Sequence, residues 1–201
     1  MKLWYSPASP FVRKVLVMAH ETGLIEKLEL NLVASTAIQP DPELSKVNPL
    51  TKIPTLELED GSTIFDSTVI CEYLDTLHDG QKMIPDDETR WNTLVTQSIG
   101  NGILEAAVGV RYEQALRPQE HQWDVWMNGQ FAKIDKALDV LETWRGARIQ
   151  DMHIGSITVA CALAYLDFRH GDRDWREGRP VLTQMLETFS RRTSMLQTRP
   201  E

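Results

Sequence analysis

The spacing of apolar residues divides the chain into a first part with strand and helix patterns and a second part with helix patterns alone. Residues 2–5 form a short extended run, and from Phe11 the apolar residues recur at helical spacing as far as Gly23. Residues 28–32 alternate between apolar and polar types like a strand. A polar, proline-rich stretch over residues 35–49 follows. This order predicts a strand, a helix, a second strand and a loop.

A hairpin and a helix are predicted next. Residues 54–59 and 62–65 alternate on either side of Asp60-Gly61, a dipeptide that favours the tight turn between antiparallel strands. Asp66-Ser67 then opens a segment with helical apolar spacing that ends near Gly80. The first part of the chain is therefore expected to be a small mixture of strands and helices.

Strand patterns disappear after a connector around residues 83–86. Four later segments favour helix by composition and spacing: residues 91–117, 120–145, 154–170 and 181–192. The glycines within the first of them indicate close packing or a bend: Gly100, Gly102 and Gly109. Residues 159–164 are apolar on every face, which is typical of a helix buried at a domain centre. The predicted fold is an α/β domain at residues 1–80 followed by an all-α domain at residues 86–201.

Composition and charge narrow the classes of function. The chain has 201 residues, with 21 Lys plus Arg and 29 Asp plus Glu, which gives a formal net charge of −8. Because an acidic chain without a dense basic block is a poor partner for nucleic acid or an anionic membrane, we expect neither as a partner. The longest mainly apolar stretch, residues 157–168, is shorter than the ~18 residues of a membrane span. The chain opens without a signal-peptide pattern, so we expect a cytoplasmic protein.

Neither a disulfide framework nor a metal site is expected. The two cysteines, Cys71 and Cys161, lie in separate apolar segments, where an unpaired thiol is most simply a core residue. The five histidines are scattered without a metal-binding spacing such as HExxH. We therefore expect no bound metal.

Three short segments carry candidate chemistry, and the first is Ser9-Pro10. Serine suits the N-cap of a helix, and proline suits its first helical position. The Ser9 hydroxyl then stands beside unpaired backbone N–H groups, a place that stabilises an anion. The alternative, in which Ser9 only caps the helix, is the commoner role for serine at such a position.

The second segment is residues 47–56, around Ile53-Pro54. A cis bond before Pro54 turns the chain sharply and leaves neighbouring backbone groups facing outward, where an extended peptide can pair with them. Lys52, just before the turn, is placed to meet a carboxylate. A plain turn into the hairpin is the alternative.

The third segment is Asp66-Ser67, again at a predicted helix start. Ser67 and the backbone N–H groups there can bind a ligand carboxylate, and Asp66 can accept a hydrogen bond from a ligand ammonium group. The alternative is a pair of capping residues.

Similarity to a known family lies in three stretches: SPASPFVRKV (6–15), NPLTKIPTLELEDGSTIFDSTVICEYL (48–74) and SITVACALAYLDFR (156–169). Together they resemble the glutathione S-transferase family, especially its small bacterial members and serine-type classes. The resemblance covers nearly the whole chain. It implies a thioredoxin-like N-terminal domain, a helical C-terminal domain and a homodimer. The implied activity is that of a glutathione transferase, which uses the thiolate of its co-substrate glutathione for addition to, or displacement on, a small electrophile.

The resemblance also implies roles for particular residues. Six of them match positions that bind glutathione: Ser9 at the sulfur, Lys52 near the glycyl carboxylate, Ile53 as the backbone partner of the cysteinyl group, Pro54 as the cis-proline, and Asp66 and Ser67 at the γ-glutamyl end. Ser9 is the expected catalytic residue, with Tyr5 and Ser6 as the alternatives for activating the thiol. Three aromatic residues are candidates for the electrophile pocket, although core or interface packing is an equal alternative for each: Tyr112, Trp123 and Trp126.

Two departures from the family pattern bear on these expectations. The Ser/Thr-x-x-Asp box that usually starts the buried helix is replaced by residues 153–156, with His153 and Ser156 at its two ends, so we expect a weaker cap. In addition, no cysteine lies near Ser9, which disfavours reduction through a mixed disulfide. Two other functions remain open: a glutathione-binding regulatory module with weak catalysis, and a glutathione-dependent isomerase, dehalogenase or peroxidase.

Overall fold

The computed structural model describes residues 1–144 and 147–200 and contains two compact units. Unit 1 comprises residues 1–84 together with residues 192–201, and unit 2 comprises residues 85–191. The end of the chain thus packs with the first unit, whereas the sequence-based division assigns it to the second domain. Hydrophobic spacing does not distinguish these alternatives, because it reports that a helix is amphipathic but not which core it joins.

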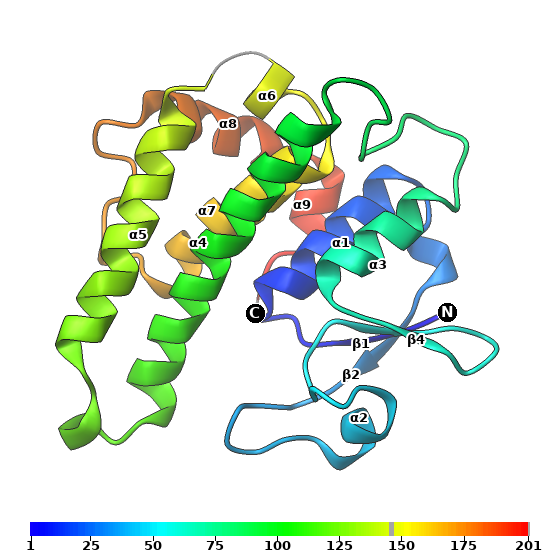
Figure 1. The fold of residues 1–201 in the computed structure, drawn as a ribbon, viewed down its shortest axis with the longest axis horizontal. Coiled ribbons are helices and arrows are strands. Elements are labelled where there is room, and N and C mark those ends of the chain that lie inside the picture. The colour runs from blue at the N-terminus through cyan, green and yellow to red at the C-terminus, as the bar shows by residue number, and fades with distance from the viewer. Residues whose placement is uncertain (145–146, 201) are drawn as a thin grey trace. The chain divides into compact units, whose positions relative to one another are not determined.

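A four-stranded sheet forms the centre of unit 1 (Figure 1). Its strands are β1 (Lys2–Tyr5), β2 (Glu29–Leu32), β3 (Thr55–Glu57) and β4 (Thr63–Ile64), in the order β2-β1-β3-β4. β1 pairs with β2 in parallel and with β3 antiparallel, and β3 pairs antiparallel with β4. The predicted hairpin is confirmed, with shorter strands than the alternation indicated. This topology brings the end of β1, the start of β3 and the end of β4 to the same end of the sheet.

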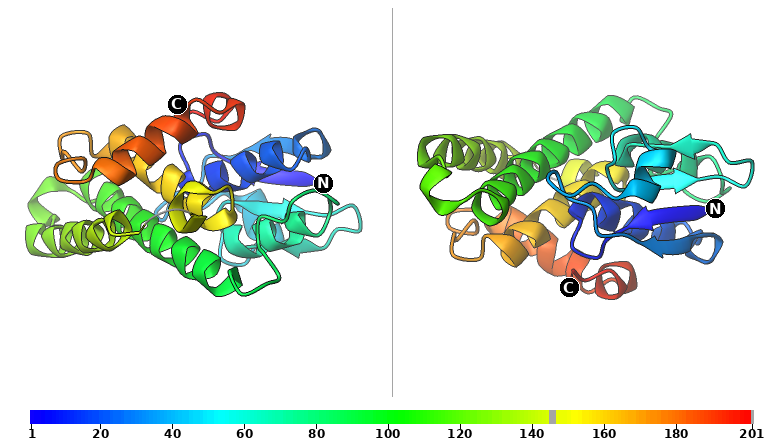
Figure 2. Two further views of the ribbon diagram at one scale, coloured as in Figure 1. Left: turned by 90° about the horizontal axis from the view of Figure 1, so that it is seen from above. Right: turned by 90° about the horizontal axis from the view of Figure 1, so that it is seen from below.

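Helices pack on both faces of this sheet (Figure 2). The helical elements of unit 1 are α1 (Pro10–Glu21), the short 3₁₀ turn η1 (Ile25–Lys27), α2 (Pro42–Val47), α3 (Ser67–Asp75) and α9 (Thr193–Gln197). The helix α1 packs against both α3 and α9. The predicted helices α1 and α3 are confirmed, and Cys71 on α3 is fully buried, as expected.

The helix α2 corrects the expectation of a loop over residues 35–49. Asp41 is its N-cap, and its Oδ1 accepts hydrogen bonds from the N–H groups of Glu43 at 2.9 Å and Leu44 at 2.8 Å. Leu44 is fully buried in a small cluster with Trp4 and Val33. Six residues are too few to produce a periodic pattern, so tertiary packing on one leucine, together with the cap, selects the helix.

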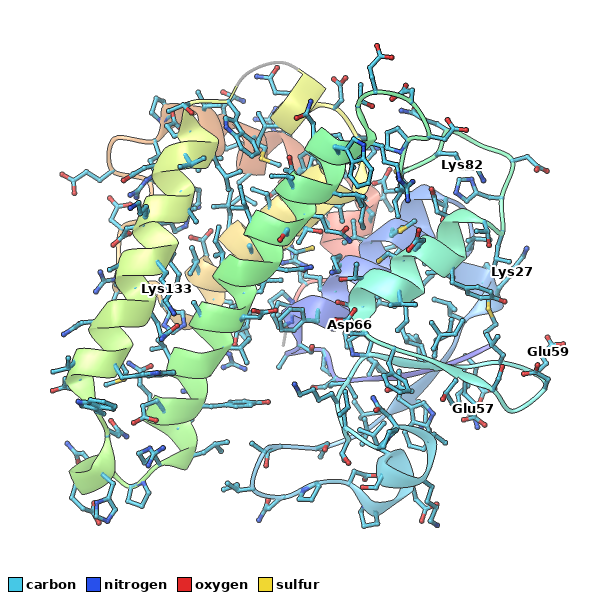
Figure 3. The ribbon with its side chains drawn as sticks, in the orientation of Figure 1. Lys27, Glu57, Glu59, Asp66, Lys82 and Lys133 are labelled. Atoms are coloured by element: carbon cyan, nitrogen blue, oxygen red, sulfur yellow. The ribbon has the colours of Figure 1, made fainter. Side chains whose placement is uncertain are left out.

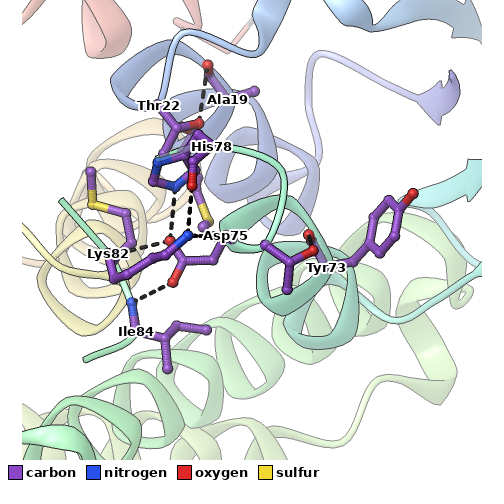
Figure 4. A network of polar contacts seen from close by, with 10 residues as sticks. Ala19, Thr22, Tyr73, Asp75, His78, Lys82 and Ile84 are labelled. Carbon is purple, nitrogen blue, oxygen red and sulfur yellow. Dashed lines mark hydrogen bonds and ion pairs between the residues drawn. The ribbon is translucent and has the colours of Figure 1, made fainter. Parts of the chain in front are cut away.

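The Asp75 carboxylate organises the chain that leaves α3 (Figure 4). It is almost fully buried and accepts hydrogen bonds from the N–H groups of Met83 at 2.8 Å and Ile84 at 3.0 Å. His78 Nε2 lies 3.1 Å from the same carboxylate, and Lys82 Nζ donates to the Asp75 carbonyl at 2.6 Å. These contacts explain why unit 1 extends to residue 84, beyond the predicted boundary at residue 80.

Unit 2 consists of helices. They are α4 (Arg90–Leu116), the 3₁₀ turn η2 (Gln119–His121), α5 (Asp124–Glu142), α6 (Ala147–Gln150), α7 (Ile154–Arg169) and α8 (Pro180–Ser190). The prediction that α7 is a central helix is confirmed, because its residues 154–163 are all buried, Cys161 among them. The segment predicted as one helix over residues 120–145 overlaps η2 and contains α5, and Arg145 lies outside the described residues. None of the helices in the described ranges combines the length and hydropathy that crossing a lipid bilayer requires.

Two of the three glycines of α4, Gly100 and Gly109, mark close packing, whereas Gly102 has no neighbour there, and α4 is one continuous helix of 27 residues. A Cβ atom added at Gly100 would lie 2.8 Å from Thr158 Cγ2 and 3.1 Å from the backbone nitrogen of Val159 on α7. The two helices therefore approach each other more closely at this position than a side chain at residue 100 would permit.

The geometry of the capping box on α7 is complete despite the unusual residues, and a weaker cap stays a prediction. The Ser156 N–H donates to His153 Nδ1 at 3.1 Å, and the His153 N–H donates to Ser156 Oγ at 3.1 Å. An imidazole nitrogen replaces the usual side-chain oxygen as the acceptor, and both reciprocal hydrogen bonds of a capping box are present.

Candidate functional site

Ser9 occupies the N-cap of α1, and Pro10 follows as its first residue. The Ser9 Oγ accepts a hydrogen bond of 3.3 Å from the Val12 N–H, and the Ser9 carbonyl accepts the first helical bond from the Arg13 N–H at 3.0 Å. Within residues 1–144 and 147–200, no acceptor takes the proton of the Ser9 hydroxyl. The half-buried Ser9 therefore caps the helix with its oxygen while its O–H remains available as a donor.

Tyr5 and Ser6, the two alternative thiol-activating residues, precede this cap. Tyr5 ends β1, and its carbonyl accepts from the Val33 N–H at 2.9 Å. The Ser6 carbonyl accepts from the Ser9 N–H at 3.1 Å, which closes a tight turn before α1. All three candidates are half-buried and lie within five consecutive positions, but only Ser9 is at the helix terminus.

The Ile53–Pro54 peptide bond is cis, and β3 begins at the next residue, Thr55. The side chain of Ile53 packs against the cluster of Trp4, Val33 and Leu44. Its backbone N–H and C=O make no hydrogen bond within the described parts of the chain. A residue with its side chain anchored and its main chain unpaired has the arrangement that an added peptide strand requires.

Asn48 holds this segment in place, and the sequence analysis did not identify it. Its buried side-chain amide donates to the Lys52 carbonyl at 3.1 Å and to Thr55 Oγ1 at 2.9 Å, while its Oδ1 accepts from the Leu50 N–H at 2.9 Å. Thr55 Oγ1 donates to the same Lys52 carbonyl at 2.8 Å. Asn48-Pro49 is a common turn signal, and only the fold reveals that the Asn48 side chain spans the whole turn.

Asp66 is the N-cap of α3, and Figure 3 labels it at the start of that helix. Its Oδ1 accepts from the Thr68 N–H at 2.8 Å, while the side chain as a whole is exposed. Ser67 is the first residue of α3 and is almost fully buried. One carboxylate oxygen therefore caps the helix, and the second has no hydrogen-bond partner within the described residues.

The sheet brings the three predicted segments to one end of unit 1. Ser9 follows the end of β1, Pro54 precedes the start of β3, and Asp66 follows the end of β4. The exposed side chain of Lys52 belongs to the same turn as Pro54, and its Nζ has no partner among the residues described. Strand pairing thus gathers residues that are more than 50 positions apart. Among them are two side-chain donors without a partner in the described residues, the Ser9 O–H and the Lys52 Nζ, together with unpaired backbone groups.

The three aromatic candidates for the electrophile pocket lie in unit 2. Tyr112 on α4 is 41% exposed, and Trp123, just before α5, is 62% exposed. Trp126 is half-buried and packs over Gly109, where an added Cβ would lie 3.2 Å from its ring. None of the three lines the cavity of about 600 Å³ in unit 2, whose walls include Phe131, His170, Arg173 and Trp175 among other residues.

Comparisons with known proteins identify the family. Residues 8–77 match the model of the glutathione S-transferase N-terminal domain. The uncharacterized GST-like protein YibF of Escherichia coli (strain K12) is 31% identical over 204 residues, which cover 100% of this chain and 98% of that protein. The chain belongs to the glutathione S-transferase family. Unit 1 is accordingly built on the thioredoxin-like N-terminal domain of this family, and unit 2 on its helical C-terminal domain.

Solved structures of other family members resemble the whole chain. A glutathione transferase family member from Pseudomonas fluorescens Pf-5, with bound glutathione, is 46% identical, with a TM-score of 0.97 and coverage of 100% of this chain and 98% of that one. A glutathione S-transferase from Methylobacillus flagellatus KT, also with glutathione bound, is 31% identical, with a TM-score of 0.86 and coverage of 100% and 99%.

Proposed function

We propose that this family member is a glutathione transferase that holds glutathione across the end of unit 1 where Ser9, Pro54 and Asp66 lie. The thiolate of the bound tripeptide then adds to a small electrophile or displaces a leaving group from it. The observation that carries the proposal is the hydrogen bonding of Ser9, whose Oγ accepts from Val12 while its O–H proton has no acceptor in the described chain. Bound glutathione in the Pseudomonas fluorescens relative supports the same ligand.

The energy required to form a thiolate matches what Ser9 can supply. A free thiol with a pKa of about 8.5 is only a few per cent ionised at neutral pH. Lowering the thiol pKa by about two units requires about 2.7 kcal/mol of preferential stabilisation of the thiolate. A hydrogen bond to a charged acceptor contributes roughly 1.5–3 kcal/mol, and a helix N-terminus contributes roughly 0.3–1 kcal/mol. The N-cap of α1 combines both contributions.

The remaining contacts to glutathione follow from the chemistry of its ends. The unpaired N–H and C=O of Ile53 suit the cysteinyl backbone, as in strand addition. The second oxygen of Asp66 suits the γ-glutamyl ammonium group, and Ser67 with the N-terminus of α3 suits the neighbouring carboxylate. Lys52 is proposed for the glycyl carboxylate. Each end of the ligand thereby meets a group of opposite charge.

The burial of both cysteines favours transfer of glutathione to an electrophile over thiol–disulfide exchange. Cys71 and Cys161 are fully buried within α3 and α7, and Ser9 occupies the position where a redox relative would carry a reactive thiol. A mixed disulfide with glutathione requires an accessible thiolate. We therefore propose transfer to a small electrophile, with Tyr112, Trp123 and Trp126 as the residues that contact it.

A homodimer is part of the proposal. Trp91 and Val95 are 72% and 47% exposed on the first turns of α4, and Val69 is 48% exposed on α3. Exposed apolar residues one turn apart on a helix are suited to an interface with a second copy.

The test is calorimetric titration with glutathione, followed by measurement of the thiolate absorbance near 240 nm against pH. We expect the wild type to bind glutathione and to hold its thiol with a pKa well below about 8.5. In Ser9→Ala, the pKa of the bound thiol should rise by one unit or more. Ser9→Asp is the matched control, because it keeps a capping oxygen but provides no donor at neutral pH. Binding without a lowered thiol pKa, together with no turnover of chlorodinitrobenzene, hydroperoxides or haloacids, would instead support a regulatory module.

A further inference from the structure

A buried cation lies one turn into α1. The side chain of Arg13 is only 7% exposed, although arginine is rarely buried without a carboxylate. Its Nη2 donates to the Met195 carbonyl at 3.1 Å, and its Nε lies 3.5 Å from Thr198 Oγ1. No Asp or Glu of the described residues forms an ion pair with it. The Arg13 charge is therefore held by neutral oxygen atoms.

The C-terminal segment, residues 192–198, supplies these oxygen atoms and is fastened along α1 at both ends. At the far end, Arg192 forms two hydrogen bonds with the Glu21 carboxylate, at 2.8 and 2.6 Å, and Ser194 Oγ donates to the same group. This pairing lowers the pKa of Glu21, chiefly through the Arg192 hydrogen bond. Thr198 Oγ1 in turn donates to the Ser194 carbonyl at 2.8 Å. The segment thus holds the Arg13 side chain in one fixed place.

Arg13 lies one helical turn after Ser9, the residue at the proposed thiolate site. Its N–H donates to the Ser9 carbonyl at 3.0 Å, and residues four apart lie on the same helix face. Helical side chains lean toward the N-terminus of their helix, so the direction of the Arg13 side chain from the helix axis is toward the end of α1 that Ser9 caps, while its guanidinium contacts Met195 and Thr198. Burial also reduces the screening of its charge by water and salt.

The other charged groups around α1 do not cancel this positive charge. On α1 itself, Glu21 is paired with Arg192 at the opposite end of the helix, and the side chain of Lys14, next to Arg13, is fully buried. On α3, Asp66 caps the helix, Glu72 is exposed, and Asp75 binds Met83 and Ile84. The helix α9 carries no charged side chain, while the turn η1 carries Glu26 and Lys27, one of each sign.

We propose that Arg13 is a positioning residue that fixes the first turn of α1 against the C-terminal segment and, through its buried charge, favours the thiolate of glutathione at Ser9. This inference rests on the proposed function. The C-terminal segment acts through Arg13, since it holds the cation beside the first turn of α1 without neutralising it. No bond is made or broken by Arg13.

The test compares two substitutions that separate charge from hydrogen bonding. Arg13→Gln retains an N–H donor for Met195 but loses the charge, and Arg13→Lys retains the charge. We expect Arg13→Gln to raise the pKa of the bound thiol by about 0.5–1 unit, and Arg13→Lys to restore most of the wild-type value. Arg192→Gln is the control, because it releases the far end of the C-terminal segment, and it should lower the melting temperature without moving the thiol pKa.

The outcomes distinguish this inference from the proposed function. Failure of the wild type to bind glutathione contradicts the proposed function itself. If the wild type lowers the thiol pKa through Ser9, and Arg13→Gln has the same thiol pKa, the role of Arg13 is overturned. An equal rise of the thiol pKa in Arg13→Gln and Arg13→Lys overturns it as well. If Arg13→Gln does not fold, citrulline at position 13 provides an uncharged isostere of arginine. It is introduced by ligating a synthetic segment of residues 1–70 to a chain that begins at Cys71. We expect the same rise of the thiol pKa in this variant.

Discussion

The imidazole Nε2 of His170 donates a hydrogen bond of 3.0 Å to the backbone carbonyl of Ala107 on α4. A carbonyl oxygen only accepts, so the neutral ring carries its proton on Nε2. The ring is also buried, and it meets the Phe131 ring edge-on at a centroid distance of 5.3 Å. Burial is the main cause that lowers the pKa of His170 below its ordinary value of 6.5.

This depressed pKa predicts a loss of stability in mild acid. Below about pH 6.5 the unfolded chain binds a proton at His170, while the folded chain binds it only at a lower pH. In the window between these two values the unfolded state holds more protons, so stability decreases as the pH falls. We expect a smaller free energy of unfolding near pH 5 than near pH 7.5, measured by urea denaturation, with part of the difference absent in His170→Gln.

The control for this prediction is His121→Gln, which changes an exposed histidine in the 3₁₀ turn η2. Its pH profile should match that of the wild type. The glutamine in His170→Gln can still donate to Ala107, so its stability at neutral pH should remain close to that of the wild type. An unchanged pH dependence in His170→Gln would contradict the role of this buried ring.

Asn48→Ala is predicted to weaken both the fold and glutathione binding. The substitution removes the donor to the buried Thr55 Oγ1, one of the two donors to the Lys52 carbonyl, and the acceptor of the partly buried Leu50 N–H. Unsatisfied buried polar groups cost about 1–3 kcal/mol, and we expect a decrease of about 2 kcal/mol in the free energy of unfolding. Calorimetry should also detect a weaker affinity for glutathione, because Ile53 loses its support. Ser45→Ala, a change at an exposed hydroxyl near the same turn, should do neither.

Asp66→Asn is predicted to lower glutathione affinity without destabilising the protein. Asparagine caps helices as well as aspartate does, so α3 should keep its N-cap and the melting temperature should change little. The loss of a charged partner for the ligand ammonium group should reduce affinity about tenfold or more. A glutathione analogue without the γ-glutamyl amine should bind both forms equally. A tenfold loss for that analogue as well would place the ammonium group elsewhere.

Two glycines on α4 are predicted to respond in opposite ways to substitution by alanine. A Cβ at Gly100 would meet Thr158 and the backbone of Val159, so Gly100→Ala should cost about 1–3 kcal/mol through overpacking. A Cβ at Gly102 would meet nothing within 4 Å, so Gly102→Ala should stabilise the helix by about 0.5–1 kcal/mol. Urea denaturation of the two variants measures both effects. Stabilisation by both would contradict the close approach of α4 and α7.

Much of the fold follows from local patterns in the sequence. Alternation around Asp60-Gly61 predicts the hairpin, and the Ser9-Pro10 and Asp66-Ser67 pairs predict the starts of α1 and α3. Each of these signals acts over a few residues, where backbone preference and capping decide the conformation. The position of Ser9 at a helix terminus could therefore be predicted, because it depends on its immediate neighbours alone.

Other features were decided only by tertiary contacts. Helix α2 forms because Leu44 enters a cluster with Trp4 and Val33, and the close approach of α4 and α7 at Gly100 is a contact that the sequence alone does not specify. The location of Arg13 beside Met195 joins two segments that no spacing rule relates.

The sequence by itself thus determined the order of the elements and the residue types at their ends, since both depend on interactions between near neighbours. The tertiary structure decided which of those ends lie together and which charges are buried. Strand pairing brings Ser9, Pro54 and Asp66 to one end of the sheet, and the packing of residues 192–198 on α1 removes Arg13 from water. Both outcomes depend on contacts between distant parts of the chain, whose free energies arise only when the whole unit is folded.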